Sequence, residues 1–144
     1  MQALANKLLC FKRTRELMLT IETLVEAMAL HRAITQAKFA ELDPIDSAIP
    51  FSEPLSNIAR RNLDSIIAYH HDHNENMEAG LWTKSRQLKS EWKGFQYIKQ
   101  RIEATSSWAN YNEDEKIKLI EILYSPFVPS ESQIKEFLRI GNET

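Results

Sequence analysis

The chain is organised around residues 82–101, WTKSRQLKSEWKGFQYIKQR, which form its most aromatic and most basic stretch. At 100° per residue, the apolar side chains of this stretch and of the residue that follows it fall within one arc, as a helix that packs on a core requires. This expected buried face consists of Leu88, Trp92, Phe95, Ile98 and Ile102. The spacing therefore predicts one amphipathic helix that runs through residues 82–101.

The opposite arc of the same predicted helix gathers basic side chains around one aromatic ring. Cations that neutralise phosphates, next to a ring that can stack on a base, are typical of a nucleic-acid contact surface. The predicted nucleic-acid-binding residues are Arg86, Lys89, Lys93, Tyr97 and Arg101. A solvated basic face that only keeps the protein soluble would give the same pattern, because charged outer faces are common on helices.

The composition is that of a folded, soluble protein. A chain of 144 residues is long enough for one domain with a real core. Hydrophobic residues make up 43% and charged residues 26%, which excludes an intrinsically disordered chain. The net charge of −2 hides an alternation, since residues 1–40 and 81–110 are net basic whereas residues 41–80 and 111–144 are net acidic. Charge in blocks favours a polarised surface or a charged partner.

The cysteine content and the N-terminal residues bear on the compartment. Cys10 is the single cysteine, so an internal disulfide is excluded and a reducing compartment is favoured. The first apolar run is short and is followed at once by Lys12, Arg13 and Arg15. We therefore expect neither a signal peptide nor a membrane span, and we predict a cytoplasmic protein.

The remaining segments predict an all-α single domain of about five helices. Residues 3–41 contain neither Gly nor Pro and predict a long first helix, whose core-facing stripe would be Leu17, Met18, Ile21, Leu24, Val25 and Met28. Unbroken, it would be roughly 58 Å long, so it either breaks near residues 30–35 or projects at its N-terminal end. Residues 43–54 hold three prolines and predict a linker to a second helix over residues 55–71.

The C-terminal half carries clear helix start signals. Residues 71–80, HDHNENMEAG, predict a loop. Asn112 with Glu115 and Ser130 with Gln133 have capping-box spacing, and each pair predicts the start of a helix. Gly141 stands where a glycine ends a helix. No stretch shows the period-two pattern of a strand.

Catalytic and metal-binding patterns are weak. Adjacent histidines on a helix point about 100° apart, so His70, His71 and His73 cannot converge on one ion. His71-Asp72 resembles the motif of the HD phosphohydrolases, for which His31 and Asp114 could complete the set, but the apolar and glycine context of that family is missing. Helical RNases of the HEPN type space their Arg and His more closely than Arg61 and His70. We predict no enzyme, no metal and no cofactor.

Two functional hypotheses remain. In the first, the protein is a non-catalytic subunit that binds single-stranded RNA or DNA through the basic face of residues 82–101. In fold class and charge segregation it looks like the small helical subunits of RNA-guided effector complexes, a resemblance that implies a place in a larger nucleoprotein assembly. In the second, the protein is a protein–protein interaction module, such as an adaptor, an assembly subunit or an inhibitor. It would then use the acidic residues 41–78, the long first helix, and an apolar anchor such as Phe11 or Trp108.

Overall fold

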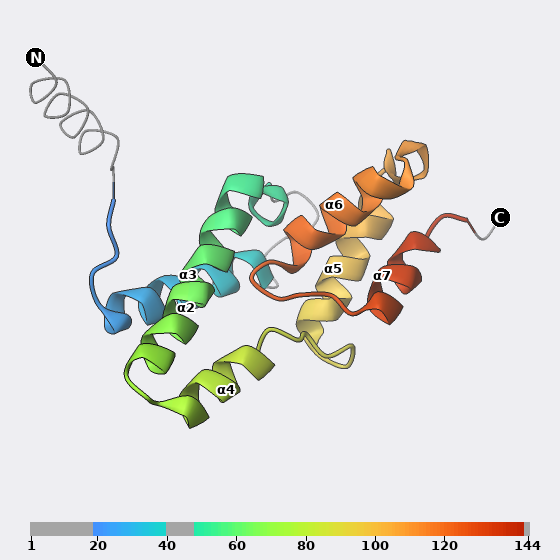
Figure 1. Cartoon of the computed structure of the whole chain (residues 1–144). Helices are drawn as coiled ribbons and strands as arrows, with labels where there is room; N and C mark the ends of the chain where they lie inside the picture. Colours follow the sequence, from blue (N-terminus) through green and yellow to red (C-terminus); the bar gives the residue numbers. More distant parts are fainter. Residues whose placement is uncertain (1–18, 40–47, 143–144) are drawn as a thin grey trace, which may run out of the picture.

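The computed structural model describes residues 19–39 and 48–142, which form six α-helices and two short 3-10 helices (Figure 1). The α-helices are α2 (Leu24–Phe39), α3 (Glu53–Asp72), α4 (Asn76–Lys84), α5 (Lys93–Ala104), α6 (Glu113–Tyr124) and α7 (Glu131–Leu138). The 3-10 helices are Ile49–Phe51 and Trp108–Asn110. The predicted all-α fold is confirmed.

Helix α2 begins at an N-terminal capping arrangement formed by Thr23 and Glu26. The N–H of Glu26 donates to the Thr23 hydroxyl oxygen at 3.2 Å, and the Glu26 carboxylate accepts from the N–H groups of Glu22 at 2.9 Å and Thr23 at 3.3 Å. The first helix therefore does not continue through residues 19–23. Of the two predicted alternatives, the break near residues 30–35 is absent, because α2 is continuous there. Residues 3–18 and 40–41 of the predicted helix lie outside the described residues.

Helix α3 matches its prediction closely. Ser52 caps it by accepting a hydrogen bond from the N–H of Leu55 at 3.3 Å. Pro54 fits the first turn because the backbone N–H that proline lacks would have no acceptor within the helix there. Its buried face includes Ala59, Leu63, Ile66, Ile67 and His70. Of the predicted linker, residues 49–51 form a 3-10 helix with Pro50 buried, and residues 43–47 lie outside the described part.

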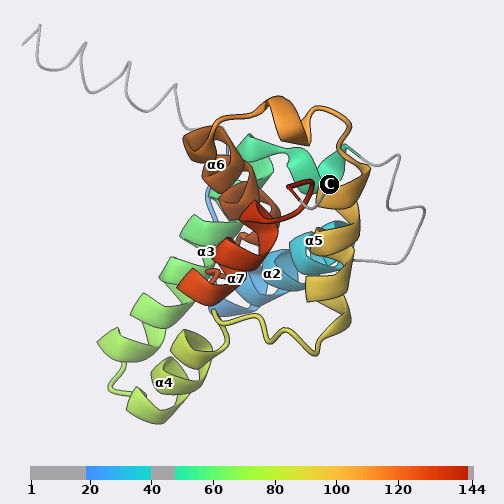
Figure 2. The same cartoon turned by 90° about the vertical axis from the view of Figure 1, so that its right-hand side faces the viewer.

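The loop predicted over residues 71–80 is mostly helix. Asn74 takes a left-handed conformation with φ 57°, which asparagine tolerates better than most residues, and this tight turn lets α4 begin at Asn76. Helix α4 then packs back on α3, with Ala79 buried against it. It lies at the opposite end of the molecule from α6 in both views (Figures 1 and 2).

The main core lies among α5, α6 and α7. Its buried residues are Leu88, Phe95, Ile98, Ile102, Trp108, Ile120, Leu123, Tyr124 and Phe137. Both predicted capping boxes are present, at Asn112 for α6 and at Ser130 for α7, and Gly141 takes a positive φ of 82°. Helix α7 ends at Leu138, and its aromatic side chain Phe137 meets Phe95 with ring centroids 5.1 Å apart.

Trp108 is a core residue and not an exposed anchor for a partner. It is buried, and its indole N–H donates to the carbonyl oxygen of Ile140 at 3.0 Å. Its proposed role as a partner contact is therefore wrong, because the ring is already enclosed by its own chain. Phe11, the other proposed anchor, lies outside the described residues.

Candidate functional site

The predicted helix over residues 82–101 is two helices separated by a loop. Helix α4 ends at Lys84 and α5 begins at Lys93. The backbone between them accepts hydrogen bonds from the C-terminal part of the chain. The N–H of Val128 donates to the Arg86 carbonyl oxygen at 2.7 Å, and the Gln133 side-chain amide donates to the Leu88 carbonyl oxygen at 2.7 Å. These tertiary hydrogen bonds hold residues 86–88 in the loop between α4 and α5 (Figure 2), and Gln87 forms an isolated bridge with Val128. The continuous helix is therefore a wrong prediction.

Two of the five predicted binding residues are engaged elsewhere in the molecule. The guanidinium of Arg86 forms an ion pair with Asp64 on α3. Arg101 is only 3% exposed, and Ile98 and Ile102 of the same helix are fully buried. Burial lowers the pKa of Arg101, and its Nε and Nη1 atoms have no hydrogen-bond partner within the described residues. The prediction that Arg101 lies on an outer basic face is wrong.

Tyr97 and the two lysines do not share one helix face either. Tyr97 is half-buried, with the Arg101 guanidinium 6.0 Å from its ring centroid. Lys89 lies in the loop, whereas Lys93 is the first residue of α5, and both are exposed. The expected arc of Arg86, Lys89 and Lys93 along two helical turns does not exist. The role of these residues in binding nucleic acid stays a prediction.

A different basic–aromatic cluster forms at the start of α5. Trp92, which we predicted to be buried with Leu88 and Phe95, is 43% exposed, and the Lys89 ammonium lies 5.7 Å from its ring centroid. Leu88 and Phe95 are buried as predicted, but Leu88 reaches the core from the loop. We call the exposed side chains of Lys89, Trp92 and Lys93 the basic–aromatic loop. It replaces the predicted helical face.

The histidines fall into separate environments. His70 is buried, with its Nδ1 atom 3.6 Å from a Glu75 carboxylate oxygen, and the His73 ring stacks on Tyr69 at 4.0 Å. His31 meets Trp82 edge-on at 5.3 Å, and burial lowers the pKa of His31. Within residues 19–39 and 48–142, no three His, Cys, Asp or Glu side chains are grouped so that they could hold a metal ion.

The acidic residues 41–78 are partly neutralised by cations of the same chain. Asp64 pairs with Arg86, and a Glu53 carboxylate oxygen lies 3.3 Å from the Lys118 ammonium. These pairs are exposed, so each contributes little to stability. They do lower the net negative charge that this part of the surface offers to a basic partner. Glu41, Asp43 and Asp46 lie outside the described residues.

An apolar groove with a volume of about 1080 Å³ lies between α2 and α3. We call it the α2–α3 groove. Its apolar lining is Leu19, Ile21, Leu24, Ala27, Leu30, Ile58 and Ile66, and its other lining residues are Glu22, Thr23, Arg61, Asn62, Ser65 and Tyr69. Several of the lining apolar side chains face solvent, since Leu19 is 80% exposed and Ile21 and Ile58 are each 39% exposed.

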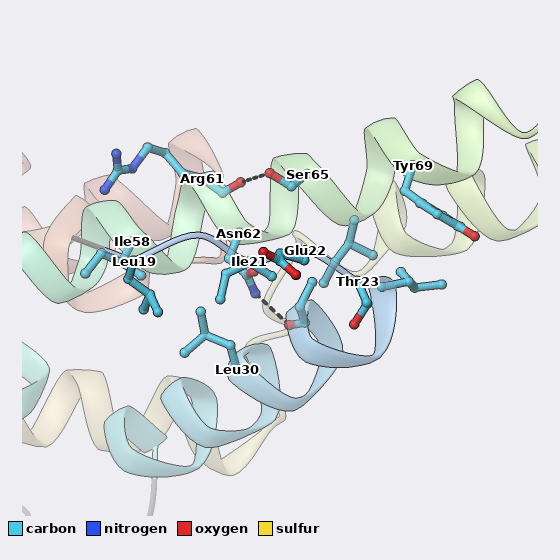
Figure 3. Close-up of a pocket in the computed structure, with 13 residues that line it drawn as sticks. Leu19, Ile21, Glu22, Thr23, Leu30, Ile58, Arg61, Asn62, Ser65 and Tyr69 are labelled. Atoms are coloured by element: carbon cyan, nitrogen blue, oxygen red, sulfur yellow. Dashed lines mark hydrogen bonds between the residues drawn. The ribbon is translucent and has the colours of Figure 1, made fainter. Parts of the chain in front are cut away.

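A buried hydrogen bond links the two walls of the groove. The Asn62 amide donates to the Ala27 carbonyl oxygen at 2.8 Å, which fixes α3 against α2 at the floor of the groove. Figure 3 shows Leu19, Ile21 and Leu30 projecting into the space between the two helices, with Ile58 beside Leu19. The residues that precede α2 thus form part of one wall.

Sequence reasoning missed this groove because it treated Ile21 and Val25 as core residues of one long helix. Val25 is 77% exposed and Ile21 lies in the extended residues before α2. A signal was present, since Thr23 and Glu26 have capping-box spacing, which predicts that a helix begins directly after Thr23. A second signal was the row Ile58, Asn62, Ser65 and Tyr69, which shares one face of α3 at helical spacing.

Sequence reasoning also missed a buried cation next to the core. Lys38 on α2 is fully buried, and its ammonium donates to Ser56 Oγ at 2.8 Å and to the carbonyl oxygens of Ile122 at 2.7 Å and Ser125 at 2.5 Å. These three acceptors match the three ammonium protons. Burial, and to a smaller extent the charge of Arg101, lower the pKa of Lys38 to about 7. The ammonium joins α2, α3 and α6, so its role is structural.

Comparisons with protein-family models, with curated proteins and with solved structures find no match to this chain. Among the described residues, no helix is both long enough and apolar enough to span a membrane.

Proposed function

We propose that the protein is a non-catalytic interaction module that binds an apolar segment of a protein partner in the α2–α3 groove. The observation that supports this most is the exposure of Leu19, Ile21 and Ile58 on the walls of a groove of about 1080 Å³. Exposed apolar side chains that gather along a groove, unlike single exposed ones, are typical of interaction sites. A volume at the upper end of the range for ligand pockets has room for several side chains of a peptide.

The mixed lining of the groove favours a protein segment over a small apolar molecule. Glu22, Arg61 and Ser65 line the groove together with its apolar residues. Polar side chains beside apolar ones can bind the polar groups of a peptide, and protein–protein interfaces are mixed in the same way. An amphipathic helix that presents apolar residues at i, i+4 and i+7 would suit a groove between two helices.

The test is co-purification of the untagged protein from its source cells with two matched variants. Ile58→Glu places a charge on the groove wall, whereas Leu81→Glu places the same charge on α4, at a residue that is 62% exposed and outside the groove. We expect wild type and Leu81→Glu to retain one partner in fixed ratio, and Ile58→Glu to lose it while keeping its helical circular dichroism spectrum. Equal retention by all three proteins would refute the proposal.

A second candidate function is the binding of single-stranded nucleic acid by the basic–aromatic loop. It is favoured by one observation: an exposed Trp92 ring stands between the exposed lysines Lys89 and Lys93. Stacking of a base on an aromatic ring is worth about 1–3 kcal/mol, and nearby lysines add a salt-dependent attraction to phosphates.

Fluorescence anisotropy with labelled RNA and DNA at several salt concentrations tests this second candidate. Trp92→Ala should weaken binding to single strands by about 1–3 kcal/mol and binding to duplexes little. Lys89→Ala should lower the slope of log affinity against log salt by roughly one unit. Absence of binding at low salt, both by the purified chain and by its co-purified complex, would contradict this function.

A further inference from the structure

The N-terminal segment of the chain is attached directly to the α2–α3 groove. Leu19 lines the groove, so residues 1–18 continue from one of its walls. A binding segment joined by a short linker has an effective local concentration in the millimolar range, which a separate molecule rarely reaches. Among possible occupants, a segment of the same chain is therefore favoured over a second copy of the protein.

The sequence of this segment has the apolar pattern that a groove between helices accepts. Residues 1–18, MQALANKLLCFKRTRELM, contain neither Gly nor Pro. Leu4, Leu8 and Phe11 stand at i, i+4 and i+7, the spacing with which a bound helix presents its anchors to a groove. Lys7, Lys12 and Arg13 fall outside the arc of these three anchors, and the opposite face would hold Arg13 together with Leu9.

The length of the connection permits the contact. The α3 wall of the groove extends from Ile58 to Tyr69, which is about 17 Å at 1.5 Å per residue. The residues between Phe11 and Leu19 number seven, and an extended chain of that length spans up to about 25 Å. Phe11 can therefore reach either end of the groove from the fixed position of Leu19.

We propose that residues 1–18 occupy the α2–α3 groove of their own chain, with Leu4, Leu8 and Phe11 as anchors, and that a protein partner must displace them to bind. This inference rests on the proposed function, because it assigns a regulator to the same groove. The apolar walls would then be covered in the free protein. Partner binding would be weakened by the fraction of molecules whose groove is already filled.

The single cysteine of the chain allows a direct test in the full-length protein. Cys10 lies between the anchors Leu8 and Phe11, and Ser65→Cys adds a second thiol at an exposed position on the groove wall. Ser90→Cys adds a thiol next to Lys89 of the basic–aromatic loop, away from the groove, and serves as the control. Each protein is oxidised mildly at low concentration and followed by non-reducing electrophoresis and peptide mass spectrometry.

We expect an internal disulfide between Cys10 and the introduced thiol to form at least about tenfold faster in Ser65→Cys than in Ser90→Cys. Adding Phe11→Glu to Ser65→Cys should reduce the rate to that of the control. Equal rates in the two single variants would overturn the inference, and so would a faster product that is a disulfide-linked dimer, since the occupant would then be a second copy.

The result separates this inference from the proposed function. If Ile58→Glu loses a partner but the internal disulfide does not form preferentially, the groove binds a partner and the N-terminal segment does not regulate it. If the disulfide forms as expected but Ile58→Glu loses no partner, the internal contact stands and the proposed interaction function falls.

Discussion

The core among α5, α6 and α7 and the groove between α2 and α3 are built from the same kind of amphipathic helix, but only the core is closed. In the core, Phe95 and Phe137 are at most 2% exposed, because α7 covers the angle between α5 and α6. Along the groove, Ile58 and Leu19 remain in contact with solvent. The difference is that no third element of the described residues covers the groove, and two helices alone cannot enclose the apolar face that they share. The open pair is therefore where a further segment would bind.

The largest expected effect separates the closed region from the open one. Phe95→Ala should lower the free energy of unfolding by about 3–5 kcal/mol, because it leaves a cavity in a close-packed core. Ile58→Ala should cost less than about 1.5 kcal/mol, since its side chain is already 39% exposed. Urea denaturation followed by circular dichroism measures both. Similar losses in the two variants would mean that the groove wall is as tightly packed as the core.

The next effect concerns the buried Lys38, which lies beside the closed core. Its folded-state pKa of about 7 is below the ordinary value of 10.5, so the unfolded chain binds more protons between these two pH values. The free energy of unfolding should therefore rise with pH from about pH 7, by at most about 1.4 kcal/mol per pH unit. Denaturation at pH 7, 8 and 9 measures the slope.

Lys38→Met is the matched variant for this pH dependence. It keeps an unbranched side chain of similar length and removes the titrating group. We expect its stability to be flat over the same pH range. The range stops at pH 9 because burial raises the pKa of Tyr124, and ionisation of that phenol would lower stability at higher pH. A slope that survives in Lys38→Met would assign the pH dependence to another group.

The smallest expected effect tests whether the Trp92 side chain is exposed or buried. The ring is 43% exposed at the start of α5, so Trp92→Ala should cost no more than about 1 kcal/mol of stability. A core tryptophan would cost about 3–5 kcal/mol. Thermal denaturation distinguishes the two values. A stability loss of about 3–5 kcal/mol would indicate that Trp92 is buried, as the helical wheel predicts.

The sequence predicts those parts of the fold that depend on local signals. The capping boxes at Asn112 and Ser130 and the helix predicted over residues 55–71 are confirmed because each depends on residues within a few positions of one another. The predicted face of residues 82–101 fails for the opposite reason. Hydrogen bonds from Val128 and Gln133, which are distant in sequence, take the backbone of residues 86–88 out of the helix.

The candidate site was predictable only in part. Lys89 and Lys93 are exposed as expected, whereas the burial of Arg101 follows from how α5 is rotated against α6 and α7, and the sequence of α5 alone does not determine that rotation. The groove depends on where α2 begins. The local signal at Thr23 and Glu26 was available, but the exposure of Ile58 follows from tertiary packing.

The central claim is that the open α2–α3 groove is the interaction surface, and photo-crosslinking in the source cells tests it most directly. A photoreactive side chain is placed at residue 58 on the groove wall and, in a matched protein, at residue 81 on α4. We predict a discrete crosslinked species heavier than the monomer from residue 58 and none from residue 81. The same heavy species from both positions, or one from residue 81 alone, would contradict the claim.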